Sequence, residues 1–248
     1  MSRRAPLRSM RPIQMLPNLM TLGAICAGLT SVRFAFDGNA GLSMSLIVLA
    51  AVLDGLDGTV ARLLKSESEI GAELDSLADF VNFGVAPGLL LYLWALQSGR
   101  SAGWIAVLIF AICCAMRLAR YNVMSRKEPG KKQMYFSGVP APGGALLVLM
   151  PLVLARVLPE IFQPVLHTFA GIWLVLVGMM MISTIPTPSP KLLKVSRDKA
   201  AYVMVASMGL IAAFFTYPWP VVLAVELGYL AILARFALRR KHLIPEEN

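Results

Sequence analysis

The chain carries four aspartates in two short stretches, Asp54-Gly-Leu-Asp57-Gly58-Thr-Val-Ala61-Arg62 and Gly71-Ala-Glu-Leu-Asp75-Ser-Leu-Ala-Asp79. The flanking segments, 42–53 and 80–96, are apolar enough to lie inside a membrane. On insertion scales one uncompensated aspartate at the bilayer centre costs about 2.5–3.5 kcal/mol, so four cost roughly 10 kcal/mol or more. A stably inserted protein needs a partner for such a cluster, and groups that only accept hydrogen bonds indicate bound cations. The stretches therefore predict a site within the membrane.

The composition of the whole chain is that of a polytopic membrane protein. Of its 248 residues, 57% are hydrophobic and only 15% are charged, whereas soluble domains carry about 25% charged residues. The apolar runs predict an all-α transmembrane helical bundle of about eight spans. These spans are 17–35, 43–64, 72–97, 102–124, 141–158, 165–185, 200–217 and 219–238. We expect one transmembrane domain over 17–240, preceded by a basic amphipathic or disordered segment at 1–16 and followed by a cytoplasmic tail at 241–248.

The net charge of +9 is explained by its distribution along these spans. When the connections are assigned to alternate sides, all but three of the 23 Lys and Arg residues fall on the amino-terminal side, the exceptions being Arg33, Arg100 and Arg156. The positive-inside rule then places both termini in the cytoplasm, as in a protein of the inner (cytoplasmic) membrane. This asymmetry accounts for the basic balance by contact with anionic membrane lipid, without a nucleic-acid partner.

The spacing of the aspartates predicts how they meet. The second and third spans are joined by a short connection, so they are expected to be antiparallel neighbours. Asp57 then lies at the depth of Asp75, and Asp54 at the depth of Asp79. At 1.5 Å per residue, Asp57 is about 12 Å below Lys65. The site is therefore expected in the cytoplasmic half of the membrane, within reach of the cytosol.

Each of the two spans collects its site residues on one face. On the second span these are Asp54, Asp57, Gly58, Ala61 and Arg62, and on the third they are Gly71, Asp75 and Asp79. Carboxylates in this arrangement suit a pair of hard divalent cations such as Mg²⁺ or Mn²⁺, which leave positions open for phosphate. The glycines and alanine leave room for a bulky ligand, and the guanidinium fork suits phosphate oxygens. The alternative is a structural helix–helix contact, but one arginine can neutralise only one of four acids.

The full pattern, Asp-x2-Asp-Gly-x2-Ala-Arg-x8-Gly-x3-Asp-x3-Asp, resembles the signature of the CDP-alcohol phosphotransferases, with every position filled. The resemblance implies cleavage of a CDP-linked substrate by an alcohol that displaces CMP, in a protein that forms a homodimer. It implies that Asp54, Asp57, Asp75 and Asp79 hold two divalent metals and that Asp79 is also the general base. Gly58, Ala61, Arg62 and Gly71 would line the pocket for CDP-diacylglycerol.

Other segments are similar to the phosphatidylserine synthase branch of that family. The last aspartate is followed by Phe83-Gly84-Val-Ala-Pro87, and Phe80 stands where phosphatidylglycerolphosphate synthases tend to have lysine. Asn82 departs from the branch, which is expected to have a small serine there. The further similar segments are Pro17-Asn18-Leu-Met-Thr21, Cys114-Ala-Met-Arg117-Leu-Ala-Arg120-Tyr-Asn122 and Phe136-Ser-Gly138-Val-Pro140-Ala-Pro142. This resemblance implies L-serine as the acceptor and phosphatidylserine as the product.

Arg117, Arg120 and Asn122, near the cytoplasmic end of the fourth span, are candidates for binding the serine carboxylate. An arginine can hold a carboxylate through two parallel hydrogen bonds. Ordinary anchoring of the span at the membrane surface is the alternative for either arginine. For the whole chain, the same chemistry with choline, inositol or glycerol 3-phosphate stays open. A cation transporter is disfavoured because a cation path gains nothing from Arg62 beside its acids.

Overall fold

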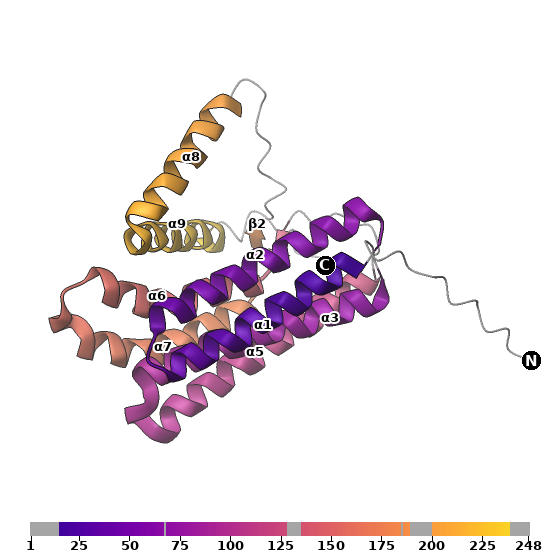
Figure 1. Cartoon of the computed structure of the whole chain (residues 1–248). Helices are drawn as coiled ribbons and strands as arrows, with labels where there is room; N and C mark the ends of the chain where they lie inside the picture. The colour runs from indigo at the N-terminus through magenta and orange to yellow at the C-terminus, as the bar shows by residue number, and fades with distance from the viewer. Residues whose placement is uncertain (1–14, 67, 128–134, 185, 189–199, 239–248) are drawn as a thin grey trace, which may run out of the picture.

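The structure is a computed structural model that describes residues 15–66, 68–127, 135–184, 186–188 and 200–238. Its α-helices are α1 (Leu16–Phe36), α2 (Ala40–Leu64), α3 (Glu69–Asp79), α4 (Ala86–Leu91), α5 (Arg100–Lys127), α6 (Ala141–Val157), α7 (Gln163–Ile182), α8 (Ala200–Thr216) and α9 (Pro218–Leu238). Figure 1 shows them as a bundle of long rods, from which α8 diverges. The predictions for residues 1–14 and 239–248 lie outside the described residues.

Within the described residues, six helical segments are long and apolar enough to cross a membrane. They are Leu16–Phe36, Ala40–Leu64, Glu69–Gly99, Ser101–Met124, Glu160–Ile182 and Pro218–Leu238. These segments coincide with six of the eight predicted spans. The other two predicted spans, 141–158 and 200–217, coincide with α6 and α8, which have only 17 residues each.

The third of these segments is continuous, but its helical turns are not uniform. Phe80–Val85 and Tyr92–Leu96 form π-helical turns, and Gln97–Gly99 forms a 3₁₀ turn. The N–H of Ala86 donates to the carbonyl of Val81, five residues earlier. Pro87 has no N–H, and its ring would meet the carbonyl four residues earlier in a regular α-helix, so a wider turn before it relieves the clash. Such turns are frequent at functional sites, and this one begins directly after Asp79.

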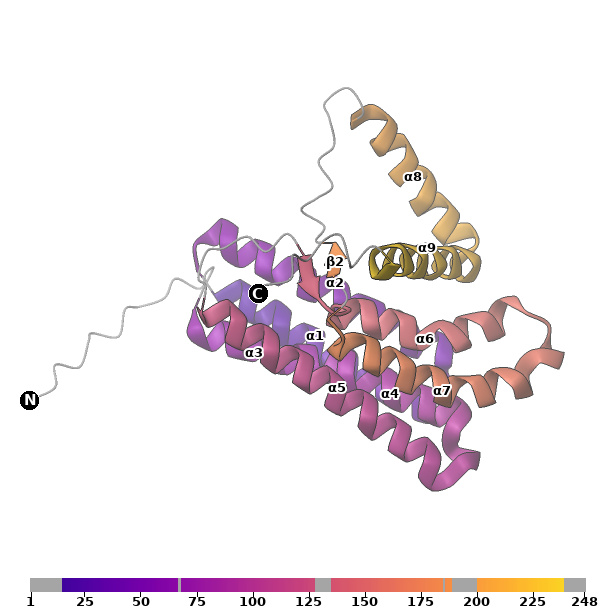
Figure 2. The ribbon, with the colours of Figure 1, turned by 180° about the vertical axis from the view of Figure 1, so that it is seen from behind.

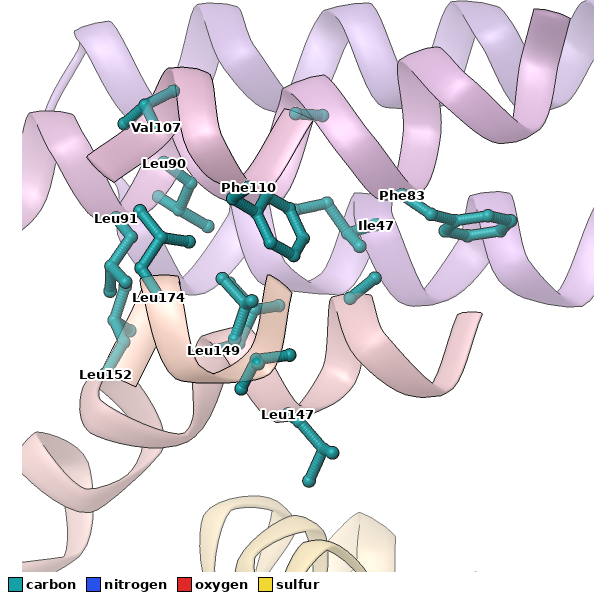
Figure 3. Close-up of a cluster of buried hydrophobic side chains, with 14 of the residues drawn as sticks. Ile47, Phe83, Leu90, Leu91, Val107, Phe110, Leu147, Leu149, Leu152 and Leu174 are labelled. Carbon is teal, nitrogen blue, oxygen red and sulfur yellow. The ribbon is translucent and has the colours of Figure 1, made fainter. Parts of the chain in front are cut away.

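The core is formed where α2, α4, α5, α6 and α7 meet. Buried side chains from all five helices and from the first π-helical turn lie together in Figure 3, among them Ile47, Phe83, Leu90, Phe110, Leu147 and Leu174. The α1–α2 contact instead uses small residues, Ala24, Ala27 and Ala50. Small side chains let helix backbones approach closely, which is how membrane helices gain packing energy in the absence of a hydrophobic driving force.

A small sheet departs from the purely helical prediction. β1 (Tyr135–Ser137) pairs antiparallel with β2 (Pro186–Pro188), with Phe136 opposite Thr187. The Thr187 hydroxyl donates to the carbonyl of Gly138 at 2.8 Å. Strands of three residues are too short to produce an alternating sequence pattern, so the sequence gives no signal for them. The sheet fixes the start of α6 to the end of α7.

The ends of α2, α6 and α9 meet on the side of the bundle opposite the aspartates. The Arg156 guanidinium lies over the Trp219 ring, 5.6 Å from its centroid, and a Cβ on Gly41 would lie 3.8 Å from both side chains. The α1–α2, α6–α7 and α8–α9 connections, which the predicted topology places on the same side of the membrane, are thus close together. Figure 2 shows the bundle from the reverse face.

Candidate active site

The acidic faces of α2 and α3 are held opposite each other by α1, which packs against both helices and lies between them in Figure 1. The connection ends α2 with Lys65 in a left-handed conformation at φ 50°. The Ser68 hydroxyl then accepts a hydrogen bond from the Gly71 N–H at 3.0 Å and caps the start of α3. α2 and α3 pack mainly on α1 rather than on each other. Their acidic side chains therefore occupy the space between them.

All four predicted aspartates meet in this space. The carboxyl groups of Asp54 and Asp79 lie close enough to each other to interact directly. Asp75 lies within electrostatic range of Asp54 and Asp57. Asp57 is only 4% exposed, and its Oδ2 accepts a hydrogen bond from the Thr21 hydroxyl at 2.5 Å. The predicted pairing of Asp54 with Asp79 is therefore present.

The donor set suits hard divalent cations. Among the described residues, Asp54 Oδ1 and Asp79 Oδ1 are buried and have no hydrogen-bond partner, so each is an acceptor whose desolvation a cation would offset. As the side chains stand, no three His, Cys, Asp or Glu residues in the described part of the chain are arranged to hold one ion. Ligation therefore requires rotation of aspartate side chains from the positions they hold here. The aspartates therefore fit divalent cations in the chemistry of their oxygen donors and in their proximity to one another.

A cavity of about 260 Å³ opens beside the carboxylates of Asp57 and Asp75. Gly58, Ala61 and Gly71 line it, as predicted for the nucleotide pocket. A Cβ on Gly58 would have no atom within 4 Å, so this wall is open. Arg62 is not among the lining residues; it is exposed, and its guanidinium donates to the Thr59 hydroxyl at 3.3 Å.

Residues outside the predicted set complete the cavity wall. Pro17, Asn18 and Thr21 contribute from α1, and Ser66 and Ser68 from the connection before α3. The α1 residues belong to the segment already noted for its resemblance to known enzymes. Ser68 carries a sequence signal only as a helix cap, which does not reveal that it faces a cavity.

The three candidates for serine binding separate in the structure. Arg117 is buried, at 9% exposure, and lies within electrostatic range of Asp79. Arg120 donates to the carbonyl of Ile182 at 2.6 Å, at the end of α7. Asn122 donates to the Ser76 hydroxyl at 2.9 Å and so connects α5 to α3. Arg117 is thus the candidate placed at the carboxylates, whereas the other two hold helices together.

Glu226 in α9 is a further buried acid, which the sequence analysis did not single out. It is 3% exposed, and neither carboxylate oxygen has a hydrogen-bond partner in the part of the chain that the structure describes. It lines an apolar cavity of about 460 Å³ between α8, α9 and the bundle. That cavity shares no lining residue with the one beside Asp57, so Glu226 is separate from the aspartate cluster.

Comparison with known proteins agrees with the motif. The family model described as CDP-alcohol phosphatidyltransferase matches residues 14–184. A Mycobacterium leprae protein named CDP-diacylglycerol–serine O-phosphatidyltransferase is 41% identical over 221 residues, covering 88% of this chain and 73% of that protein. A Mycobacterium bovis protein of the same name is 36% identical over 236 residues, covering 94% and 82%.

A relative from another genus carries the same name. A Helicobacter pylori protein, also named CDP-diacylglycerol–serine O-phosphatidyltransferase, is 36% identical over 183 residues, covering 74% of this chain and 76% of that protein. The matched family region contains α1 to α7, and with them all four aspartates and the residues of their cavity. The chain belongs to the CDP-alcohol phosphatidyltransferase family.

Proposed function

We propose that this chain transfers the phosphatidyl group from CDP-diacylglycerol to the hydroxyl of L-serine, forming phosphatidylserine and releasing CMP. The observation that carries the proposal is the convergence of Asp54, Asp57, Asp75 and Asp79. Two of them, Asp57 and Asp75, line a cavity walled by small residues. The relatives with the same named activity, aligned over most of the chain, support serine as the acceptor.

The reaction requires a base and a place for the leaving group. The serine oxygen attacks the phosphorus next to diacylglycerol, the bond from that phosphorus to the bridging oxygen breaks, and CMP leaves with the electron pair. Asp79 accepts the serine hydroxyl proton, because a neutral hydroxyl is a weak nucleophile without a base in hydrogen-bond reach. Its partnerless buried Oδ1 is an acceptor available for that proton.

The four aspartates would hold two divalent cations, Mg²⁺ or Mn²⁺. Bound ions of this kind neutralise charge on diphosphate oxygens. The chain's own part is to leave space for the cytidine diphosphate at Gly58, Ala61 and Gly71. Arg62 follows Ala61 in α2 and is exposed, so its guanidinium would have to turn from Thr59 toward the cavity to meet the phosphates. Asp57 is oriented by Thr21, which fixes one side of the carboxylate cluster.

The membrane arrangement is part of the proposal. We place α6 and α8 as the fifth and seventh of eight spans, both termini in the cytoplasm and the aspartates below the cytoplasmic face of the inner membrane. The uneven distribution of Lys and Arg supports this orientation. There the acyl chains stay in lipid while serine arrives from water. The family resemblance supports a homodimer.

The test is CMP release from CDP-diacylglycerol by the purified protein with Mn²⁺ or Mg²⁺, run in parallel with L-serine, choline, inositol and glycerol 3-phosphate. Serine-dependent release that is lost in Asp79→Asn is the expected result. Release with a different alcohol would keep the site and overturn the acceptor. No release with any alcohol would overturn the transferase proposal and favour cation transport.

A further inference from the structure

Tyr229 of α9 presents a buried polar atom that the site described so far does not use. Its hydroxyl oxygen is buried and has no hydrogen-bond partner among the described residues. Tyr229 and Glu226 share the face of α9 that packs on α6. A buried hydroxyl without a partner is destabilising unless a ligand supplies the missing hydrogen bond. The groups around the Tyr229 hydroxyl therefore indicate which ligand could supply that hydrogen bond.

The ring of Tyr229 is seated against the first turn of α6. A Cβ on Gly143 would lie 2.8 Å from the Tyr229 hydroxyl oxygen and 3.1 Å from the ring. Only glycine at position 143 lets the hydroxyl approach this closely, since real Cβ atoms do not come within 3 Å of such a neighbour. The hydroxyl is thus held at a fixed point above the amino-terminal end of α6.

Arg117 connects this hydroxyl to the aspartates. Its guanidinium lies within electrostatic range of both the Tyr229 hydroxyl and the Asp79 carboxylate. Neither Arg117 nor Tyr229 lines the cavity beside Asp57 and Asp75. The aspartates therefore have two different surroundings, small residues on the side of Asp57 and the Arg117 guanidinium, with the Tyr229 hydroxyl beyond it, on the side of Asp79.

We propose that Tyr229 and Arg117 form the subsite that binds the carboxylate of the acceptor amino acid. The inference rests on the proposed function and assigns a substrate contact to α9, which lies outside the family-matched region 14–184. The hydroxyl and the guanidinium both donate to the carboxylate. The acceptor's own hydroxyl then faces Asp79, which takes its proton.

The test compares Tyr229→Phe with wild type in CMP release, varying L-serine and CDP-diacylglycerol separately. Loss of one hydrogen bond to a charged group raises the serine KM about tenfold or more. The CDP-diacylglycerol KM and the kcat at saturating serine stay unchanged. Tyr217→Phe is the matched control. It makes the same chemical change at a residue that is 65% exposed and lies away from the site.

Gly143→Ala provides a second variant that keeps the tyrosine. Its methyl group displaces the hydroxyl without removing it, and alanine suits a helix, so the serine KM is expected to rise as in Tyr229→Phe. A serine KM that is unchanged in active Tyr229→Phe, or a rise shared equally by both substrates, would overturn the subsite. Wild-type protein that releases CMP only with another alcohol would instead overturn the proposed function.

Discussion

Replacing Gly58 with alanine is expected to leave the fold intact and to weaken binding of the CDP-linked substrate. A Cβ at this position meets no atom within 4 Å, so the folded chain accommodates it. In a helix interior alanine is favoured over glycine by roughly 0.5–1 kcal/mol, so stability is expected to rise or stay constant. The methyl group, however, projects at the wall of the 260 Å³ cavity. Overfilling a fitted space costs about 1–3 kcal/mol, which is roughly 5- to 150-fold in affinity.

Gly55→Ala is the matched control for this prediction. Gly55 lies three residues earlier in α2, and a Cβ there also meets no atom within 4 Å, but Gly55 does not line the cavity. The assay measures the KM for CDP-diacylglycerol at saturating serine, together with thermal unfolding in detergent followed by tryptophan fluorescence. The reasoning predicts a raised KM for Gly58→Ala alone. Equal KM values in the two variants would refute the view that Gly58 leaves space for substrate.

Three further predictions test the metal requirement, the contact between Thr21 and Asp57, and the packing of Gly28 against Asn82. Removal of divalent cations by a chelator should abolish CMP release, and Mg²⁺ or Mn²⁺ should restore it; full activity in the chelator would contradict the role of the aspartates. Thr21→Val removes the hydroxyl that orients Asp57 and should lower activity or metal affinity about 10- to 100-fold, whereas Thr30→Val, which loses only a bond to its own helix, should not. Gly28→Ala brings a methyl group against the Asn82 amide and should lower the free energy of unfolding by about 1–3 kcal/mol; Asn82→Ser in the same chain should restore it, and a failure to do so would show that the contact is not the cause.

The helical segments could be predicted because their apolar runs are long and are separated by polar or proline-containing connections. The π-helical turn after Asp79 could not, because it depends on how the chain relieves the missing N–H of Pro87. The short strands around Phe136 and Thr187 were missed for a different reason, since three residues carry no periodicity. The position of α1 between α2 and α3 is set by tertiary packing, which the short α2–α3 connection does not predict.

The aspartate cluster could be predicted because helical spacing alone puts its members on facing sides of neighbouring segments. The partners of Arg120 and Asn122 could not, since they lie 62 and 46 residues away in sequence. Tyr229 and Glu226 each stand alone in an apolar run and belong to no motif. Their burial and partnerless oxygens become visible only when α9 is packed against α6.

The most direct test of the account is phosphatidylserine formation from L-serine and CDP-diacylglycerol by four single variants, Asp54→Asn, Asp57→Asn, Asp75→Asn and Asp79→Asn. Glu226→Gln is the matched control, because Glu226 is a buried acid outside the aspartate cluster. Thermal unfolding of each variant establishes that it is folded. We predict a loss of about 100-fold or more in each aspartate variant and wild-type activity in the control. Wild-type activity in any folded aspartate variant, or an equal loss in Glu226→Gln, would contradict a site built from these four carboxylates.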